Sequence, residues 1–123
     1  MKNSRAGDSN GISPERVAGA VKRARAAAPA EGAAADVAAV FKALSDPTRV
    51  RILHALASGE ICVKAVAEAL GISQSLASHH LRLMWMMGLL NLTRHGRMCC
   101  YSLASRRIAK ILDEAGVLAD AGR

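Results

Sequence analysis

Aromatic side chains are scarce in this chain of 123 residues, which contains one phenylalanine, one tyrosine and one tryptophan. Proteins that bind single-stranded DNA or RNA usually stack several bases on aromatic rings. The rings of Phe41, Tyr101 and Trp85 are too few for such a platform. If the chain binds a nucleic acid, a duplex is therefore the better candidate.

Long apolar runs and an even set of cysteines are also missing. No apolar segment approaches the roughly 20 residues that span a bilayer, and the first residues lead into no hydrophobic stretch typical of a secretory signal. The three cysteines are an odd number, which does not suggest a disulfide framework. We therefore expect a protein of the reducing cytoplasm with no membrane insertion.

Acidic residues are fewer than basic ones. The chain has 10 Asp and Glu and 17 Lys and Arg, which gives a formal net charge of +7. A basic balance of this size favours a polyanionic partner such as nucleic acid, although it can also serve solubility alone. The length predicts one domain that is small enough to benefit from a dimer partner.

Residues 1–35 form a stretch rich in Ala, Gly, Ser and charge, with few large apolar side chains. This composition favours a flexible basic extension, because little apolar surface offsets the entropy lost on ordering. The alternative is one helix, capped by Ser13 and opened by Pro14. Residues 119–123 are assigned to a short C-terminal tail.

Helical spacing of apolar residues begins at Asp36 and marks the main domain, residues 36–118. Asp46 is a good helix cap ahead of Pro47, and Gly71 can end one helix in a tight turn before the next. The predicted helices cover residues 36–44, 46–59, 64–70, 74–87 and 105–118. The predicted strands cover residues 60–63, 89–93 and 98–103.

The helix over residues 74–87 has an apolar side and a polar side. Ala77, Leu81 and Met84 recur at helical spacing and belong in a core. The polar stripe carries hydrogen-bonding groups and a cation but no carboxylate, which suits base edges and phosphates in a DNA major groove. Its residues are Gln74, Ser75, Ser78, His79 and Arg82. The same pattern also fits an ordinary amphipathic surface helix.

A basic connection joins the last two predicted strands and contains Arg94, His95 and Arg97. We expect a hairpin, or wing, whose tip lies along a DNA groove or backbone, although such tips also occur as plain surface. With the helix-turn-helix before it, the wing defines the predicted fold class. It is a mainly α protein with a small β-wing, a winged helix-turn-helix.

The first and last helices of the main domain carry more apolar surface than one small core can use. We therefore predict a homodimer in which the helices over 36–44 and 105–118 pack across a two-fold axis. Such a dimer would hold its two recognition helices roughly 34 to 36 Å apart and would bind double-stranded operator DNA with an inverted repeat.

Two other classes of function are alternatives to DNA binding. A small thiol oxidoreductase would need a Cys-x-x-Cys pair and a βαβ pattern, and the chain has neither. We therefore expect no enzyme activity and no organic cofactor. A protein-interaction module would keep the winged helix and use the charge for solvation.

Four segments resemble the ArsR/SmtB family of winged-helix repressors. They are ALSDPTRVRIL over 43–53, EICV over 60–63, LGISQSLASHHL over 70–81 and GRMCCYSL over 96–103. The resemblance covers about residues 36–118. It implies a cytoplasmic homodimer that leaves its operator when an inducer binds, usually a metal or metalloid ion. By position, Gln74, Ser75, Ser78, His79 and Arg97 match DNA-contacting residues of the family.

The chain departs from both familiar inducer sites of that family. The cysteine motif Glu-Leu-Cys-Val-Cys-Asp-Leu is replaced over residues 60–66 by Glu-Ile-Cys-Val-Lys-Ala-Val, so Cys62 alone remains. The other site uses Asp and His on the last helix, where this chain has Ser105, Arg107 and residues without an imidazole. Four nitrogen and oxygen ligands for zinc cannot be assembled there, which disfavours a sensor of that kind.

The remaining candidate inducer site consists of the three thiols. By analogy with other winged helices, a strand before the helix-turn-helix would bring Cys62 close to Cys99 and Cys100. Trigonal sulfur suits As(III) or Sb(III), whereas Cd(II), Pb(II) or Zn(II) would need a further ligand such as His95 or water. Strand alternation places the two adjacent cysteines on opposite faces, which weighs against one shared site. A disulfide-forming redox sensor and an inducer-independent regulator remain alternatives.

Overall fold

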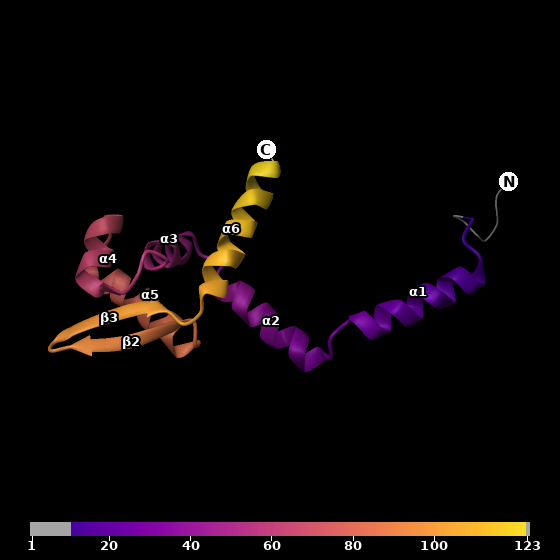
Figure 1. Cartoon of the computed structure of the whole chain (residues 1–123), viewed down its shortest axis with the longest axis horizontal. Helices are drawn as coiled ribbons and strands as arrows, with labels where there is room; N and C mark the ends of the chain where they lie inside the picture. The colour runs from indigo at the N-terminus through magenta and orange to yellow at the C-terminus, as the bar shows by residue number, and fades with distance from the viewer. Residues whose placement is uncertain (1–10, 123) are drawn as a thin grey trace. The chain divides into compact units, whose positions relative to one another are not determined.

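The structure, a computed structural model, describes residues 11–122, which form α-helices and a small antiparallel sheet (Figure 1). The helices are α1 (Pro14–Ala27), α2 (Glu31–Ala43), α3 (Pro47–Leu56), α4 (Val63–Leu70), α5 (Gln74–Met86) and α6 (Arg106–Ala121). The strands are β1 (Ile61–Cys62), β2 (Leu90–His95) and β3 (Met98–Leu103). The predicted mainly α class with a small sheet is confirmed. No helix in the described part is long and apolar enough to cross a membrane.

Contacts divide the chain into two compact units, residues 1–39 and 40–123, and the boundary falls within α2. In the first unit, Ser13 caps α1 and accepts a hydrogen bond from the backbone N–H of Arg16 at 3.3 Å. Residues 14–27 are therefore helical, as in the alternative prediction. In this segment the structure differs from the flexible basic extension that we favoured. Helix α2 begins at Glu31, earlier than the predicted Asp36, because its alanines have high helix propensity. Residues 1–10 lie outside the described part, and the domain boundary at residue 35 stays a prediction.

The second unit is built from the caps and turns that the sequence predicts. The Asp46 carboxylate accepts a hydrogen bond from the N–H of Arg49 at 3.0 Å, and Pro47 opens α3. Gly71 ends α4 with a φ of 68°, a left-handed conformation that favours glycine. Ser73 then caps α5 by accepting a hydrogen bond from the N–H of Leu76 at 3.0 Å. The short turn between α4 and α5 is therefore fixed by local chemistry.

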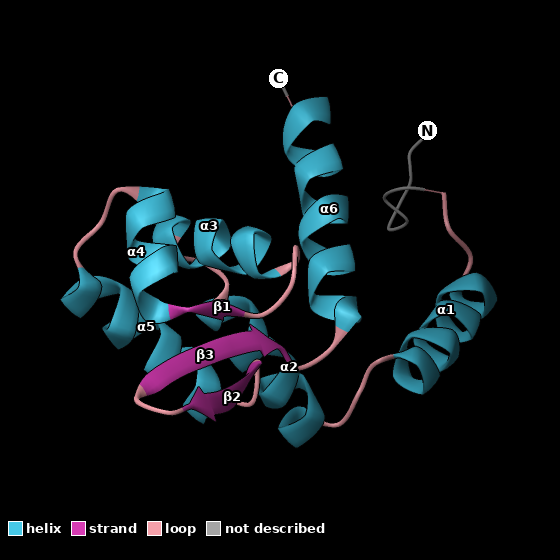
Figure 2. Cartoon of the chain, turned by 60° about the vertical axis from the view of Figure 1, so that its left-hand side comes forward, coloured by secondary structure: helices cyan, strands magenta, loops and turns pink. Residues whose placement is uncertain are grey.

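The sheet has the strand order β1-β3-β2, so the strand before the helix-turn-helix pairs with the second strand of the hairpin (Figure 2). One face packs on the helices through apolar side chains: Ile61, Leu90, Leu92, Cys99, Tyr101 and Leu103. Alternation along the strands puts Cys62, Thr93, His95 and Cys100 on the other face. The predicted divergence of Cys99 and Cys100 is confirmed.

The hairpin turn is shorter than predicted. Arg94 and His95 belong to β2, and His95 is paired with Met98, which leaves only Gly96 and Arg97 between the strands. A φ of 64° at Gly96 supplies the left-handed geometry that a two-residue hairpin turn requires. The basic residues therefore lie at the end of a paired strand and in the two-residue turn beside it, and not in a four-residue loop.

Candidate DNA-binding surface and ligand cluster

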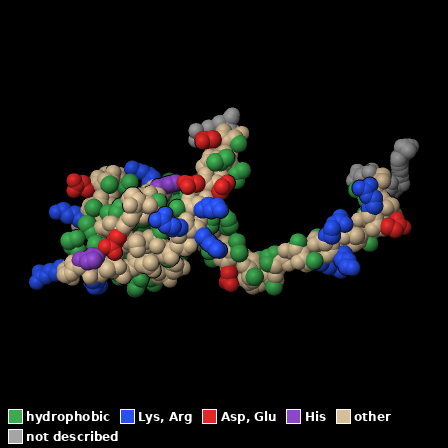
Figure 3. All heavy atoms as spheres, viewed as in Figure 1, with side chains coloured by type: hydrophobic (Ala, Val, Ile, Leu, Met, Phe, Trp, Pro, Cys, Tyr) green, Lys and Arg blue, Asp and Glu red, His purple; other side chains and the backbone are tan. Residues whose placement is uncertain are grey.

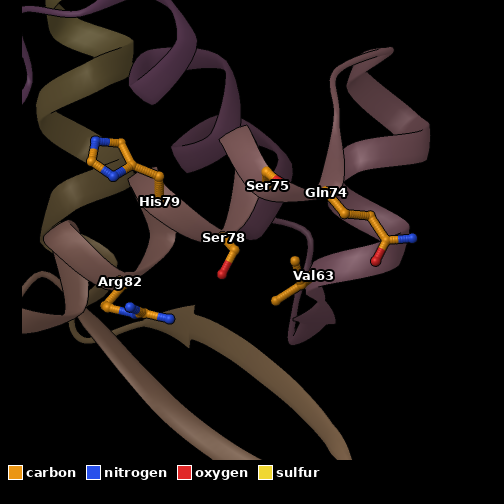
Figure 4. A pocket seen from close by; sticks show the side chains of 6 residues that line it. All are labelled: Val63, Gln74, Ser75, Ser78, His79 and Arg82. Carbon is orange, nitrogen blue, oxygen red and sulfur yellow. The ribbon is translucent and has the colours of Figure 1, made fainter.

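The polar stripe of α5 borders an open pocket of about 460 Å³ (Figure 4). Its lining consists of Val63, Gln74, Ser75, Ser78, His79 and Arg82. On the opposite side of α5, Ala77, Leu81 and Met84 are fully buried. These three side chains hold the helix against the core, and the stripe faces away from it. Ser78 is half-buried and the other stripe residues are exposed, so their polar groups are available to a ligand.

Two adjacent histidines of α5 have different surroundings. His79 is exposed, whereas His80 is half-buried and accepts at Nδ1 a hydrogen bond from Nε of Arg49, 3.2 Å away. Arg49 also donates from Nη1 to the carbonyl of Ala43 at 3.3 Å. Burial is the main cause that lowers the pKa of His80, and the positive charge of Arg49 adds to it while Asp46 opposes it. His80 therefore fixes α5 to α3, and His79 is left to contact a partner.

Basic side chains gather at the wing, where Figure 3 shows Lys and Arg atoms at the far end of the hairpin. Arg94 and Arg97 are both exposed. Burial raises the pKa of Tyr101, Cys99 raises it further, and the charges of Arg82 and Arg94 oppose that rise. Arg82 lines the pocket beside the polar stripe, and Arg97 lines the neighbouring cavity together with Gln74. His95 differs from them, because its Nε2 lies 2.8 Å from Oε1 of Glu60.

The three predicted thiol ligands are neighbours, but they do not converge on one point. Cys62 is opposite Cys100 in the register of β1 and β3. Cys99 lies on the other face of β3. It lines a cavity of about 330 Å³, which Cys62 on the edge strand β1 also lines together with Gln74 and Arg97. Among the described residues, the three thiols do not form a group with all sulfur atoms within 4.8 Å of one another. Burial is the main cause that raises the pKa of the Cys100 thiol, with contributions from Glu60, Cys62 and Cys99.

A different trio does bring its ligand atoms together. A carboxylate oxygen of Glu60, a ring nitrogen of His95 and the sulfur of Cys100 all lie within 4.8 Å of one another. Glu60 is not among the ligands predicted from the sequence. Its spacing from Cys62 was the available signal, because residues two apart in extended chain share a face.

The helix-turn-helix of α4 and α5, with its exposed polar stripe and basic hairpin, defines a winged-helix DNA-binding regulator. Residues 46–91 match the family model described as "Bacterial regulatory protein, arsR family". The chain is 44% identical over 94 residues to the HTH-type transcriptional regulator NmtR of Mycobacterium tuberculosis, covering 76% of this chain and 78% of that protein. The chain belongs to the ArsR/SmtB family of transcriptional repressors. The resemblance stated from sequence is thereby confirmed, and members of this family are DNA-binding regulators and not enzymes.

Solved structures agree with this assignment. An antimony-specific transcriptional repressor, AntR, is 30% identical and superposes with a TM-score of 0.69 over 76% of this chain and 85% of that chain. A homodimeric winged helix-turn-helix domain from Mycobacterium bovis is 35% identical, with a TM-score of 0.65 over 76% of this chain and 90% of that chain. The predicted winged helix-turn-helix is therefore confirmed.

Proposed function

We propose that this repressor acts in the cytoplasm as a homodimer on an inverted-repeat operator and is released by a soft metal or metalloid ion bound to cysteine thiolates. One observation carries the proposal. Cys62 and Cys99 line the same cavity as Gln74, which begins the recognition helix α5, and Arg97 at the wing turn. An ion bound there would displace groups on both DNA-contacting elements at once.

The operator contacts follow from the surface chemistry of α5 and the wing. Gln74, Ser75, Ser78 and His79 present donors and acceptors at the length that reaches base edges in a major groove. Arg82, Arg94 and Arg97 supply cations for phosphates, which position the protein without selecting sequence. His95 has a weaker claim to a DNA contact, because Glu60 already occupies its Nε2.

Dimerisation is supported by an apolar groove between α2 and α6, of about 630 Å³, whose lining includes Phe41, Ile111 and Leu118. Phe41 is 58% exposed and Leu118 is 73% exposed in the single chain. Large apolar side chains that are clustered at this exposure usually mark an interface. The homodimeric relative from Mycobacterium bovis gives the same indication.

The inducer is proposed to be As(III) or Sb(III), with Cd(II), Pb(II) and Zn(II) as ions that need an additional ligand. Trigonal sulfur ligation would need Cys62, Cys99 and Cys100 to converge. Because Cys99 and Cys100 lie on opposite faces of β3, this strand would have to twist when the third thiolate joins. The relative described as antimony-specific supports a metalloid. Binding must also displace the thiol proton of Cys100, whose raised pKa makes this step dependent on pH.

A second candidate signal is thiol oxidation, which the position of Cys62 opposite Cys100 favours. Residues directly opposite in antiparallel strands have Cα atoms roughly 4.5 to 5.5 Å apart, within the range of about 4.4 to 6.8 Å that a disulfide spans. Peroxide would take two electrons and two protons from the thiol pair, giving one disulfide and two molecules of water.

The test measures operator affinity by fluorescence anisotropy on DNA from upstream of the protein's own gene. As(III), Sb(III), Cd(II), Pb(II), Zn(II) and peroxide are titrated against the complexes of the wild type and of Cys62→Ser, Cys99→Ser and Cys100→Ser. We expect the inducing ion to weaken binding by about 5- to 150-fold in the wild type. His54→Gln, which changes an exposed histidine of α3, is the control.

Each outcome of this titration has a clear meaning. Release that survives all three cysteine substitutions would show that the thiolate proposal is wrong. Release by peroxide alone, lost in Cys62→Ser and Cys100→Ser but kept in Cys99→Ser, would support the oxidation candidate instead. Absence of sequence-selective binding at moderate salt would contradict the proposed operator recognition itself.

A further inference from the structure

Three side chains with metal-binding atoms meet on the face of the sheet that points away from the helices. Glu60 precedes β1, His95 ends β2 and Cys100 lies within β3. Their carboxylate oxygen, ring nitrogen and sulfur are all within 4.8 Å of one another. Because the strand register brings them together from three separate segments, their proximity is a product of the fold and not of neighbouring positions in the chain.

We propose that Glu60, His95 and Cys100 bind a divalent ion of the Zn(II) class, with water as the fourth ligand. Zinc bonds of about 2.0 to 2.3 Å in tetrahedral geometry place ligand atoms roughly 3.3 to 3.6 Å apart. The contact of 2.8 Å between His95 and Glu60 has to open slightly, and the sulfur has to approach. Because the ligand atoms lie within 4.8 Å of one another, these changes alter the distances between them by at most about 1.5 Å.

The donor set selects the class of ion. One thiolate, one imidazole and one carboxylate suit borderline ions such as Zn(II) and Co(II), whereas Mg(II) and Ca(II) prefer oxygen alone. As(III) prefers three sulfur atoms, so it belongs to the thiolate proposal and not to this trio. The two anionic ligands balance the charge of a divalent ion, and the proton that leaves the Cys100 thiol passes to solvent.

The three ligand side chains differ in their exposure to solvent. The side chains of His95 and Glu60 are 56% and 39% exposed, which leaves a path for the ion from solvent. Cys100 is 5% exposed and forms the inner end of the site. The bound ion would join the start of β1 to the end of β2, next to the wing turn at Arg97. It shares Cys100 with the proposed inducer site but uses neither Cys62 nor Cys99.

The test is a Co(II) titration of the metal-free full-length protein under reducing conditions, followed by absorption. We expect one ion per chain, strong tetrahedral ligand-field bands and a sulfur-to-cobalt charge-transfer band in the near ultraviolet. His95→Gln and Glu60→Gln change exposed side chains, and each should weaken Co(II) binding at least about tenfold. Cys100→Ser should remove the charge-transfer band, with circular dichroism checking that this variant folds. Cys99→Ser and His54→Gln are the matched controls and should bind Co(II) as the wild type does.

The result that overturns this site is wild-type affinity in both His95→Gln and Glu60→Gln, or no stoichiometric binding at all. A charge-transfer band that requires Cys99 would place the ion in the cavity of the inducer proposal and would also overturn it. DNA is absent from the assay, so a failure here leaves As(III)-dependent operator release intact. If As(III) does not release the wild-type protein from its operator in the anisotropy experiment, only the proposed function is contradicted, and the Co(II) site is unaffected.

Discussion

Arg49 in α3 donates a hydrogen bond from its Nε to Nδ1 of His80 in α5, across 3.2 Å. The acceptor nitrogen must be unprotonated for this bond to exist. Burial and the guanidinium charge both lower the pKa of His80 from its ordinary value of 6.5. The neutral ring therefore belongs to the folded state, and its contact connects α3 with the recognition helix α5.

Acid should destabilise the protein through this contact. The unfolded chain takes up a proton on His80 near pH 6.5 while the folded chain resists it, so the unfolded state binds more protons below that pH. The free energy of unfolding should fall as the pH drops from about 6.5 through the lower pKa of the folded state. Denaturant titrations across this range should show a shallower fall in His80→Gln than in the wild type. An equal fall in both proteins would remove His80 as the cause, and His54→Gln should behave as the wild type does.

Gly71→Ala should destabilise the winged-helix unit by about 1 to 2 kcal/mol. An added Cβ has open space there, so the cost comes from the φ of 68°, which side chains rarely adopt. Gly116→Ala is a matched control, because that residue lies inside α6 and an added Cβ again meets nothing within 4 Å. The control should stabilise the protein by roughly 0.5 to 1 kcal/mol. Thermal unfolding curves give both values. If the two substitutions change the free energy of unfolding in the same direction, the explanation by backbone conformation is contradicted.

Phe41→Glu should convert the proposed dimer into monomers. The substitution places a carboxylate in the apolar groove beside Ile111 and Leu118, where a partner surface would have to desolvate it. Since Phe41 is 58% exposed in the single chain, the fold itself should be kept. Sedimentation measures the change, with Val17→Glu on α1 as a control outside the groove at a residue that is 48% exposed. A Phe41→Glu protein that sediments as a dimer would show that this groove is not the interface.

His79→Ala should weaken specific operator binding by about 1 to 3 kcal/mol while non-specific binding stays close to that of the wild type. Arg97→Ala should act differently. Log affinity falls with log salt, and the loss of one phosphate contact should make this fall less steep by about 0.9. Anisotropy titrations at several salt concentrations separate the two effects. Equal losses on operator and random DNA for His79→Ala would mean that this ring contacts the backbone and no base.

Local signals in the sequence were enough for most of the helical framework. Asp46 and Pro47 locate the start of α3, and Gly71 with Ser73 locates the turn before α5. The 3.6-residue period separates the buried Leu81 from the exposed polar stripe. These features depend on neighbours within four residues along the chain, so they can be derived without knowledge of tertiary contacts.

The ligand cluster could not be derived in this way. Glu60 and His95 are 35 positions apart, and their contact depends on the pairing of β1 with β3 and of β3 with β2. The wing turn was also too long in the prediction, because charge in the sequence suggests a loop although pairing continues through His95. Pairing register is a tertiary property, and the chain's local composition does not encode it directly.

The alternation of β3 limits how this strand can change in length. Tyr101 is buried on the helix side while Cys100 lies on the opposite side. A single-residue insertion or deletion within residues 98–103 would exchange the two faces of every residue beyond it, moving the thiol into the core and the ring out of it. Related sequences should therefore vary in length at the turn of residues 96–97 and keep a constant number of residues in this strand.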